Sequence, residues 1–107
     1  MALTDQKCVP CEGGVQPFTA AQIQEYVVQL KTEWEVVAFH KIKKQFKFKD
    51  FKDAIVFVNK IAEIAEKEGH HPDITINYNR VTIELSTHSI GGLSENDFIL
   101  AAKIEQV

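Results

Sequence analysis

The chain has 107 residues, of which 45% are hydrophobic and 25% are charged, and its formal net charge is -3 at pH 7. This length predicts one domain over residues 1–107, and the acidic balance argues against direct nucleic-acid binding, which needs a basic field. No apolar run approaches the ~20 residues of a membrane helix, and the N-terminus lacks the charged-then-apolar pattern of a signal peptide. We therefore expect a cytoplasmic protein without a membrane segment.

Residues 1–17 are predicted to form a loose leader, because the segment contains Gly13-Gly14 and Pro17. It holds the only two cysteines, in Cys8-Val9-Pro10-Cys11. A redox pair of this spacing needs a strand before it and a helix after it, and a structural zinc site needs two more ligands. Neither context is evident. We expect the pair to be reduced and without a catalytic role.

A helix and two strands are predicted next along the chain. Thr19-Ala20-Ala21-Gln22 forms a capping box that begins a helix over about 20–31. Trp34–Phe39 and Ile42–Phe48 are rich in β-branched and aromatic residues, which predicts an antiparallel pair with its turn near His40 and Lys41. The lysines of the second strand alternate in part with apolar residues, which favours a solvated strand face.

A second helix with a broad apolar stripe follows. Asp50 or a neighbour can cap its start, and Gly69 is the preferred residue for a left-handed cap at its end. Because Pro72 cannot extend the helix, His70 and His71 are expected in a tight exit loop. The apolar positions of the stripe are Ala54, Ile55, Val58, Ile61, Ala62 and Ala65.

Apolar and polar residues then alternate along 74–79 and again along 81–86, which predicts a second hairpin. In an ideal hairpin the end of the returning strand lies beside the start of the outgoing strand. This geometry is expected to bring Thr87 and His88 close to His71.

Gly91-Gly92 ends the last strand, and Ser94-Glu95-Asn96-Asp97 is a capping-box variant at the start of a C-terminal helix. This helix is apolar around most of its circumference, which is more than one sheet can cover. We therefore expect self-association through it. The predicted class is α+β in the order α-β-β-α-β-β-α, with a four-stranded antiparallel sheet and three helices packed on one face.

Three of the four histidines, namely His70, His71 and His88, lie between residues 68 and 89. A metal site is disfavoured because adjacent residues in an extended chain point to opposite sides. A polar loop that happens to contain histidines would explain one such residue better than three. Imidazoles titrate near pH ~6.5, so two of them can supply a proton donor and a proton acceptor. No P-loop, GxGxxG or Ser-His-Asp pattern is present, so the predicted chemistry is proton transfer on a small molecule, with no metal or cofactor.

Four motifs together closely resemble the pterin-4a-carbinolamine dehydratases. They are Glu66-x-x-x-His70-His71-Pro72, Tyr78-Asn79-Arg80-Val81, Ser86-Thr87-His88 and Gly92-Leu93-Ser94-Glu95-x-Asp97. The resemblance extends from about Thr19 to the C-terminus. It implies dehydration of 4a-hydroxytetrahydrobiopterin to quinonoid dihydropterin, a hydro-lyase step in tetrahydrobiopterin recycling.

The resemblance also implies which residues form the site. His70, His71 and His88 are implied as the catalytic trio, although which of them donates the proton stays open. Glu66 and Asp97 are interpreted as orienting groups, and for Asp97 a role as a helix cap is an equal alternative. The residues implied to surround the pterin are Glu66, Gly69, Pro72, Ser86, Thr87, Ser89 and Asp97.

The chain departs from the animal members of the family where Gly69 replaces an acid and Ile74 replaces a tryptophan, so pterin affinity and side-chain preference stay open. The resemblance implies a tetramer built from dimers, with sheets continuing across the dimer at the sheet edge, and a functional link to an aromatic amino-acid hydroxylase. Animal members also bind a homeodomain transcription factor. The alternative function is therefore a non-enzymatic interaction module of the coactivator or dimerisation-cofactor type.

Overall fold

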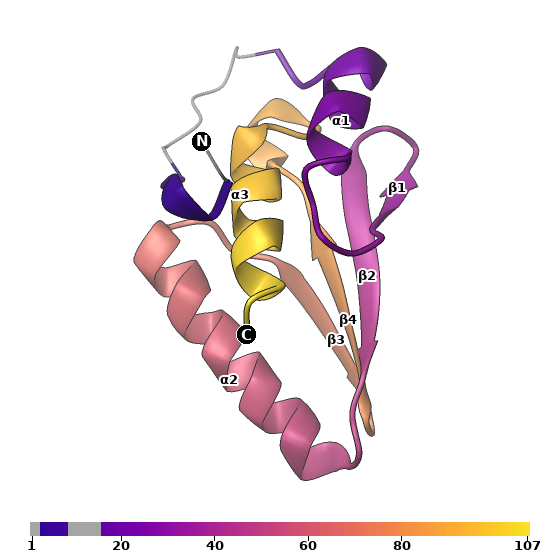
Figure 1. Cartoon of the computed structure of the whole chain (residues 1–107), viewed down its shortest axis with the longest axis vertical. Helices are drawn as coiled ribbons and strands as arrows, with labels where there is room; N and C mark the ends of the chain where they lie inside the picture. The colour runs from indigo at the N-terminus through magenta and orange to yellow at the C-terminus, as the bar shows by residue number, and fades with distance from the viewer. Residues whose placement is uncertain (1–2, 9–15) are drawn as a thin grey trace.

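The structure of the protein, a computed structural model, describes residues 3–8 and 16–107. In chain order its elements are a short 3-10 helix η1 (Leu3–Asp5), α1 (Ala20–Val27), β1 (Glu35–Val37), β2 (Lys41–Lys47), α2 (Phe51–Glu68), β3 (Asp73–Asn77), β4 (Arg80–Leu85), a 3-10 helix η2 (His88–Ile90) and α3 (Glu95–Ile104). The strands form one antiparallel sheet in the order β1-β2-β4-β3. Figure 1 shows the helices on one face of this sheet. The predicted α+β fold is confirmed.

The helix boundaries follow local capping chemistry. Thr19 N–H donates to Gln22 Oε1 at 2.9 Å and Gln22 N–H donates back to Thr19 Oγ1 at 3.3 Å, as the capping box predicted. At α2, Asp50 Oδ1 accepts from the N–H of Asp53, and Gly69 takes the left-handed φ of 69° that ends the helix. α1 is shorter than predicted, because the chain after Val27 tightens into turns with N–H···O bonds between residues three apart, and α3 ends at Ile104 rather than at the C-terminus. No helix of the described ranges is long and apolar enough to cross a membrane.

The central strands β2 and β4 carry the buried side of the sheet, whereas β1 and β3 are its edges. Val81, Ile83 and Leu85 of β4 are fully buried, as their alternation predicted. On β3 the same alternation occurs, but Ile76 is 38% exposed because this edge lies beyond the cover of the helices. The turn between β1 and β2 lies slightly before the predicted position near His40 and Lys41, because Ala38 and Phe39 adopt positive φ values.

Helix α3 lies at the centre of the core, and the chain itself covers it. Every side chain from Asn96 to Ala102 is buried, as is Ile104. η1, α1 and α2 all contact this helix (Figure 1). Leu3 of η1 is only 4% exposed. The predicted self-association through α3 therefore rested on a wrong premise, because the N-terminal segment and two helices supply the cover that one sheet cannot.

The N-terminal segment is anchored over its described residues, so the expectation of a loose leader is wrong there. Cys8 N–H donates to Glu68 Oε1 at 2.9 Å, and Lys103 Nζ donates to Glu68 Oε2 at 2.7 Å. The bond from Lys103 is the main cause that lowers the pKa of Glu68 below its ordinary value. The Cys8 thiol donates to the carbonyl oxygen of Asn96 at 3.5 Å. Cys11 lies outside the described residues, so the reduced state of the cysteine pair stays a prediction.

Candidate active site

The second hairpin places the three histidines of interest at one end of the sheet. The β3–β4 ladder ends there with Asp73 opposite Glu84. His70 and His71 lie in the short loop between α2 and β3, and His88 begins η2, three residues after the end of β4 at Leu85. Each of the three has a carboxylate beside its Nε2 atom, and the three pairs differ sharply in burial.

His70 forms the buried pair. Its Nε2 lies 2.6 Å from Asp97 Oδ1, with 12% of the imidazole side chain exposed and none of the Asp97 side chain. The left-handed turn at Gly69 fixes where His70 leaves α2, and its backbone N–H still donates to Ala65 O at 3.3 Å. Asp97 stands in the first turn of α3. The pair therefore joins the end of one helix to the start of another.

The second oxygen of Asp97 caps α3. Asp97 Oδ2 accepts from the N–H of Ser94 at 3.0 Å, within a capping box, and from the hydroxyl of Thr87 at 2.8 Å. The hydroxyl oxygens of Thr87 and Ser94 are 2.7 Å apart. The cap predicted for Asp97 is therefore present, and the contact of its other oxygen with His70 places it where the second role, orienting the imidazole, would need it.

The other two pairs are exposed. His71 Nε2 lies 2.5 Å from Glu66 Oε2, and the two side chains are 60% and 78% exposed. His88 Nε2 lies 3.9 Å from Asp73 Oδ2, with exposures of 76% and 68%. Solvent screens such pairs, so these imidazoles are held weakly. Sequence analysis missed Asp73. The register of the predicted hairpin could have indicated it, since the first residue of β3 lies near the end of β4.

A shallow pocket of about 350 Å³ opens beside His88. It contains three of the predicted site residues, Ser86, Thr87 and His88, and its full lining is His40, Lys41, Asp73, Ser86, Thr87, His88, Gly91 and Gly92. Lys41 is held by Glu84 at 2.6 Å, and the bond to Glu84 raises the pKa of Lys41. His40 comes from the turn between β1 and β2 and Lys41 is the first residue of β2, and sequence analysis did not assign either to the site.

Some predicted residues lie outside this pocket. His70 and His71 are not part of its lining. Gly69 acts as the α2 cap, Pro72 lies between His71 and β3, and Ser89 lies within η2. Gly92 has a packing reason to be glycine, because a Cβ there would meet Pro17 Cβ at 2.6 Å.

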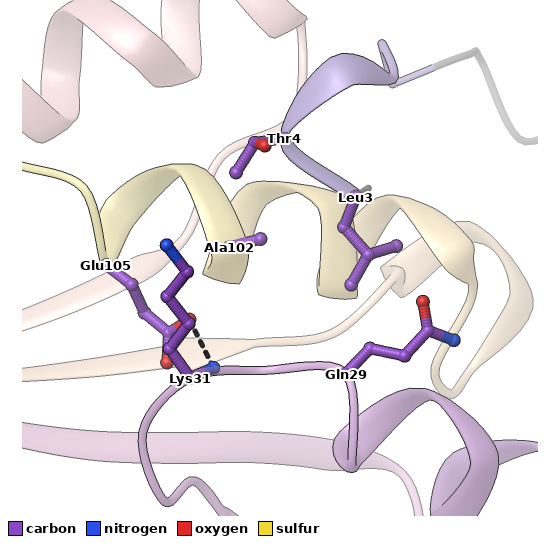
Figure 2. Close-up of a pocket in the computed structure, with 6 residues that line it drawn as sticks. All are labelled: Leu3, Thr4, Gln29, Lys31, Ala102 and Glu105. Atoms are coloured by element: carbon purple, nitrogen blue, oxygen red, sulfur yellow. Dashed lines mark hydrogen bonds between the residues drawn. The ribbon is translucent and has the colours of Figure 1, made fainter. Parts of the chain in front are cut away.

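A second pocket, of about 230 Å³, lies between η1, the loop after α1 and the C-terminal end of α3 (Figure 2). Its only carboxylate, Glu105, is already occupied by the backbone N–H groups of Lys31 and Thr32, at 3.0 and 2.8 Å, and by Trp34 Nε1 at 3.0 Å. This pocket contains no imidazole. Glu105 therefore ties the loop to α3, and the acid-base groups gather at the histidine end of the sheet.

The histidine end offers acid-base chemistry. A carboxylate beside an imidazole orients the ring and stabilises its protonated form. Across residues 3–8 and 16–107, no group of three or more His, Cys, Asp or Glu side chains is arranged to hold a metal ion. Side chains that can move a proton are thus present in the loop before β3, as His70 and His71, and at the start of η2, as His88.

Comparison with known proteins identifies relatives over nearly the whole chain. Residues 16–107 match the family model described as pterin 4 alpha carbinolamine dehydratase. A protein of Alkaliphilus metalliredigens, provisionally named a pterin-4-alpha-carbinolamine dehydratase, is 46% identical over 97% of this chain and 94% of its own. One of Rickettsia bellii with the same provisional name is 49% identical over 97% and 92%. The crystal structure of a transcriptional coactivator/pterin dehydratase from Brucella melitensis has a TM-score of 0.78 and 37% identity, over 85% of this chain and 97% of that one.

Proposed function

The chain belongs to the pterin-4-alpha-carbinolamine dehydratase family, and we propose that it dehydrates 4a-hydroxytetrahydrobiopterin to quinonoid dihydropterin by histidine acid-base catalysis. The observation that carries this proposal is the pairing of three imidazoles with three carboxylates at one end of one sheet. In this proposal His70, His71 and His88 are the catalytic residues, and the reaction belongs to tetrahydrobiopterin recycling in the cytoplasm.

The proposed reaction needs one proton donor and one proton acceptor. The C–O bond at position 4a breaks, the departing hydroxyl takes a proton and leaves as water, and the ring gives up a proton. Neutral imidazole accepts a proton and imidazolium donates one, so two histidines in different protonation states are sufficient. The carboxylates Asp97, Glu66 and Asp73 would orient the rings and stabilise the protonated forms.

The pocket beside His88 supports a small substrate. Its volume of about 350 Å³ falls in the range of about 300–1,000 Å³ found for small-molecule sites. Ser86 and Thr87 lie in its wall, and in our proposal backbone groups of this stretch, with Ser89, pair with the amide edge of the pterin as a neighbouring strand would. Gly69 and Pro72 would act indirectly, by fixing the exit of α2 from which the adjacent histidines project.

Self-association belongs to the same proposal, but through the sheet edge alone. In the described part of the chain β3 is an edge strand with a neighbour on one side only, and Ile76 within it and Tyr78 just after it are 38% and 67% exposed. Such an edge favours pairing with another strand. It also supports the alternative function, a non-enzymatic interaction module, since the Brucella melitensis relative is named both a coactivator and a pterin dehydratase. A functional link to an aromatic amino-acid hydroxylase is part of the enzymatic proposal.

Stopped-flow mixing with chemically generated 4a-hydroxytetrahydropterin tests the proposal. The intermediate dehydrates spontaneously, so the measured quantity is the acceleration that the protein adds. We expect the protein to exceed a control containing free imidazole at the same total histidine concentration, because free imidazole lacks the orienting site. A rate equal to that control would reject the dehydratase and favour the interaction module.

A further inference from the structure

We propose that the hydroxyls of Thr87 and Ser94 are positioning groups that fix His70 in one tautomer, with its proton on Nε2 and its Nδ1 free to accept a proton. The inference deepens the proposed dehydratase function and rests on it for its consequence, which is that His70 is the base of the reaction. The tautomer itself can be tested without any reaction.

The direction of each hydrogen bond follows from the number of protons available. Thr87 has a single hydroxyl proton, and it donates this proton to Asp97 Oδ2 at 2.8 Å. The 2.7 Å contact between the two hydroxyls must then be made by the Ser94 proton, with Thr87 Oγ1 accepting. The chain of donors therefore runs from Ser94 through Thr87 to Asp97.

The number of available protons also determines which ring nitrogen of His70 is protonated. An ionised carboxylate only accepts, and Asp97 Oδ2 already receives the Thr87 hydroxyl and the N–H of Ser94. The remaining oxygen, Oδ1, lies 2.6 Å from His70 Nε2, so the proton of this bond belongs to Nε2. In the neutral imidazole the lone pair is then on Nδ1, which is the acceptor that a general base requires.

Burial strengthens the hydrogen bonds that join Ser94, Thr87, Asp97 and His70. Thr87, Ser94 and Asp97 are 4%, 8% and 0% exposed, so bulk water does not compete for these bonds. Hydrogen bonds in such surroundings are stronger than in water, and an unmade one is costly. Glu66 and Asp73, the carboxylates of the two exposed pairs, have 78% and 68% of their side chains exposed to solvent.

Helix capping alone does not require the Thr87 hydroxyl. The capping box of α3 is complete with Ser94 and Asp97. The backbone of Thr87 is held separately, by bonds with Gly92 of 2.7 Å and 3.4 Å. The hydroxyl therefore adds a contact that the fold does not need, and that contact acts on the carboxylate facing His70.

The first test is nitrogen NMR of the histidine rings in the intact protein at a pH where His70 is neutral. Two-bond proton–nitrogen correlations distinguish the protonated ring nitrogen from the one with the lone pair, and His70→Gln assigns the signals. We expect His70 to be a single Nε2–H tautomer in the wild type and a mixture of tautomers in Thr87→Val. A wild-type His70 protonated on Nδ1, or a tautomer unchanged by Thr87→Val, would overturn the proposal.

The second test uses activity with a matched set of variants. Thr87→Val, which removes the hydroxyl but keeps the shape, is expected to lower kcat about tenfold or more with KM changed less than about twofold, because only the alignment of the base is lost. Thr87→Ser should restore most of the rate, and Thr75→Val on exposed β3 should behave as the wild type. Equal losses in Thr87→Ser and Thr87→Val would overturn the positioning role.

The two tests separate this inference from the proposed function. If the NMR result is as expected and the wild type does not accelerate dehydration, the tautomer assignment stands and the dehydratase proposal fails. If the wild type is active and His70 has the other tautomer, the dehydratase proposal stands and the positioning inference fails.

Discussion

His70 and His71 are neighbours in the chain, yet their surroundings are opposite. His70 is 12% exposed and bound to a carboxylate that also accepts from two other groups of the fold, the Thr87 hydroxyl and the Ser94 N–H. His71 is 60% exposed and bound to Glu66, whose side chain is 78% exposed. His88 resembles His71 in this respect. Both residues follow the left-handed turn at Gly69, in a segment that is neither helix nor strand, where adjacent side chains of an extended chain point to opposite sides.

Pairing with a carboxylate therefore has a different effect on a buried histidine than on an exposed one. A buried pair with every hydrogen bond made is fixed, and removing one partner leaves polar groups stranded. An exposed pair is worth little in stability and its side chains can move with a ligand. We therefore expect the fixed imidazole to serve as an oriented base and the two exposed imidazoles to adapt to the substrate.

The largest expected effect is on stability, and it distinguishes the two carboxylates. Asp97→Ala should lower the free energy of unfolding by about 3 kcal/mol or more, because it strands His70, Thr87 and the N–H of Ser94 in the interior. Glu66→Ala is the matched control and should change the free energy of unfolding by about 0.5 kcal/mol or less. Urea denaturation of both variants measures the difference. Similar losses in the two would mean that burial does not separate these pairs.

The next effect is on turnover. His71→Ala and His88→Ala should each lower the turnover number by about a hundredfold or more, the usual scale for loss of a general acid or base. Because both side chains are exposed, their urea midpoints should stay at the wild-type value. Stopped-flow rates and denaturation curves on the same samples check both statements. Near-normal rates in both variants would eliminate the acid-base mechanism.

How much of this could be predicted from the sequence depends on how local the cause is. Thr19, Asp50 and Gly69 act within one helical turn, and the caps they form were predicted. The alternation in β4 predicted its buried side. The cover over α3 could not be predicted, because it depends on Leu3 packing across the fold onto a helix near the other end of the chain.

In the candidate site, too, features with a local cause could be predicted from the sequence and the others could not. Three histidines at one end of the hairpin follow from strand alternation and a short exit loop, so their shared location could be predicted. Asp73 and His40 were missed because their places depend on sheet register and on the turn between β1 and β2. The network from Ser94 to Asp97 depends on rotamers, which residue spacing does not determine.

Glu105, at the C-terminal end of α3, is a third carboxylate that is held by hydrogen bonds. Burial acts to raise the pKa of Glu105, but hydrogen bonds from Thr32, Lys31 N–H and Trp34 outweigh it, so the pKa lies below the ordinary value of 4.5. A lowered pKa in the folded state means that the stabilisation is present above the ordinary value and is lost as pH falls through the lowered one.

Glu105→Gln should therefore cost about 1.5 kcal/mol of unfolding free energy near pH 7, the scale of hydrogen bonds to a charged group. As the pH falls through the lowered pKa of Glu105, the wild type and the variant should converge, since the wild-type carboxylate then becomes protonated too. Urea unfolding across this pH range measures the gap. A gap that stays constant or widens in acid would show that the charge of Glu105 does not matter.

The smallest effect is expected at the exposed pair. Glu66→Gln keeps the shape of the side chain and removes its charge. We expect it to lower the turnover number about two- to fivefold, which corresponds to the loss of about 0.4–1 kcal/mol for an exposed ion pair. The same substitution at the buried site, Asp97→Asn, should cost more than Glu66→Gln. Rates of both variants at one pH provide the test, and the reverse order would break the distinction between fixed and adaptable imidazoles.

The central claim is that the exposed imidazoles His71 and His88 are needed for proton transfer, alongside the buried base His70, but not for the stability of the fold. The most direct measurement is the stopped-flow dehydration rate of the double variant His71→Ala with His88→Ala, together with its urea midpoint. We predict a rate that falls to that of the spontaneous reaction and a midpoint equal to that of the wild type. A double variant that remains folded and still accelerates dehydration like the wild type would contradict the account.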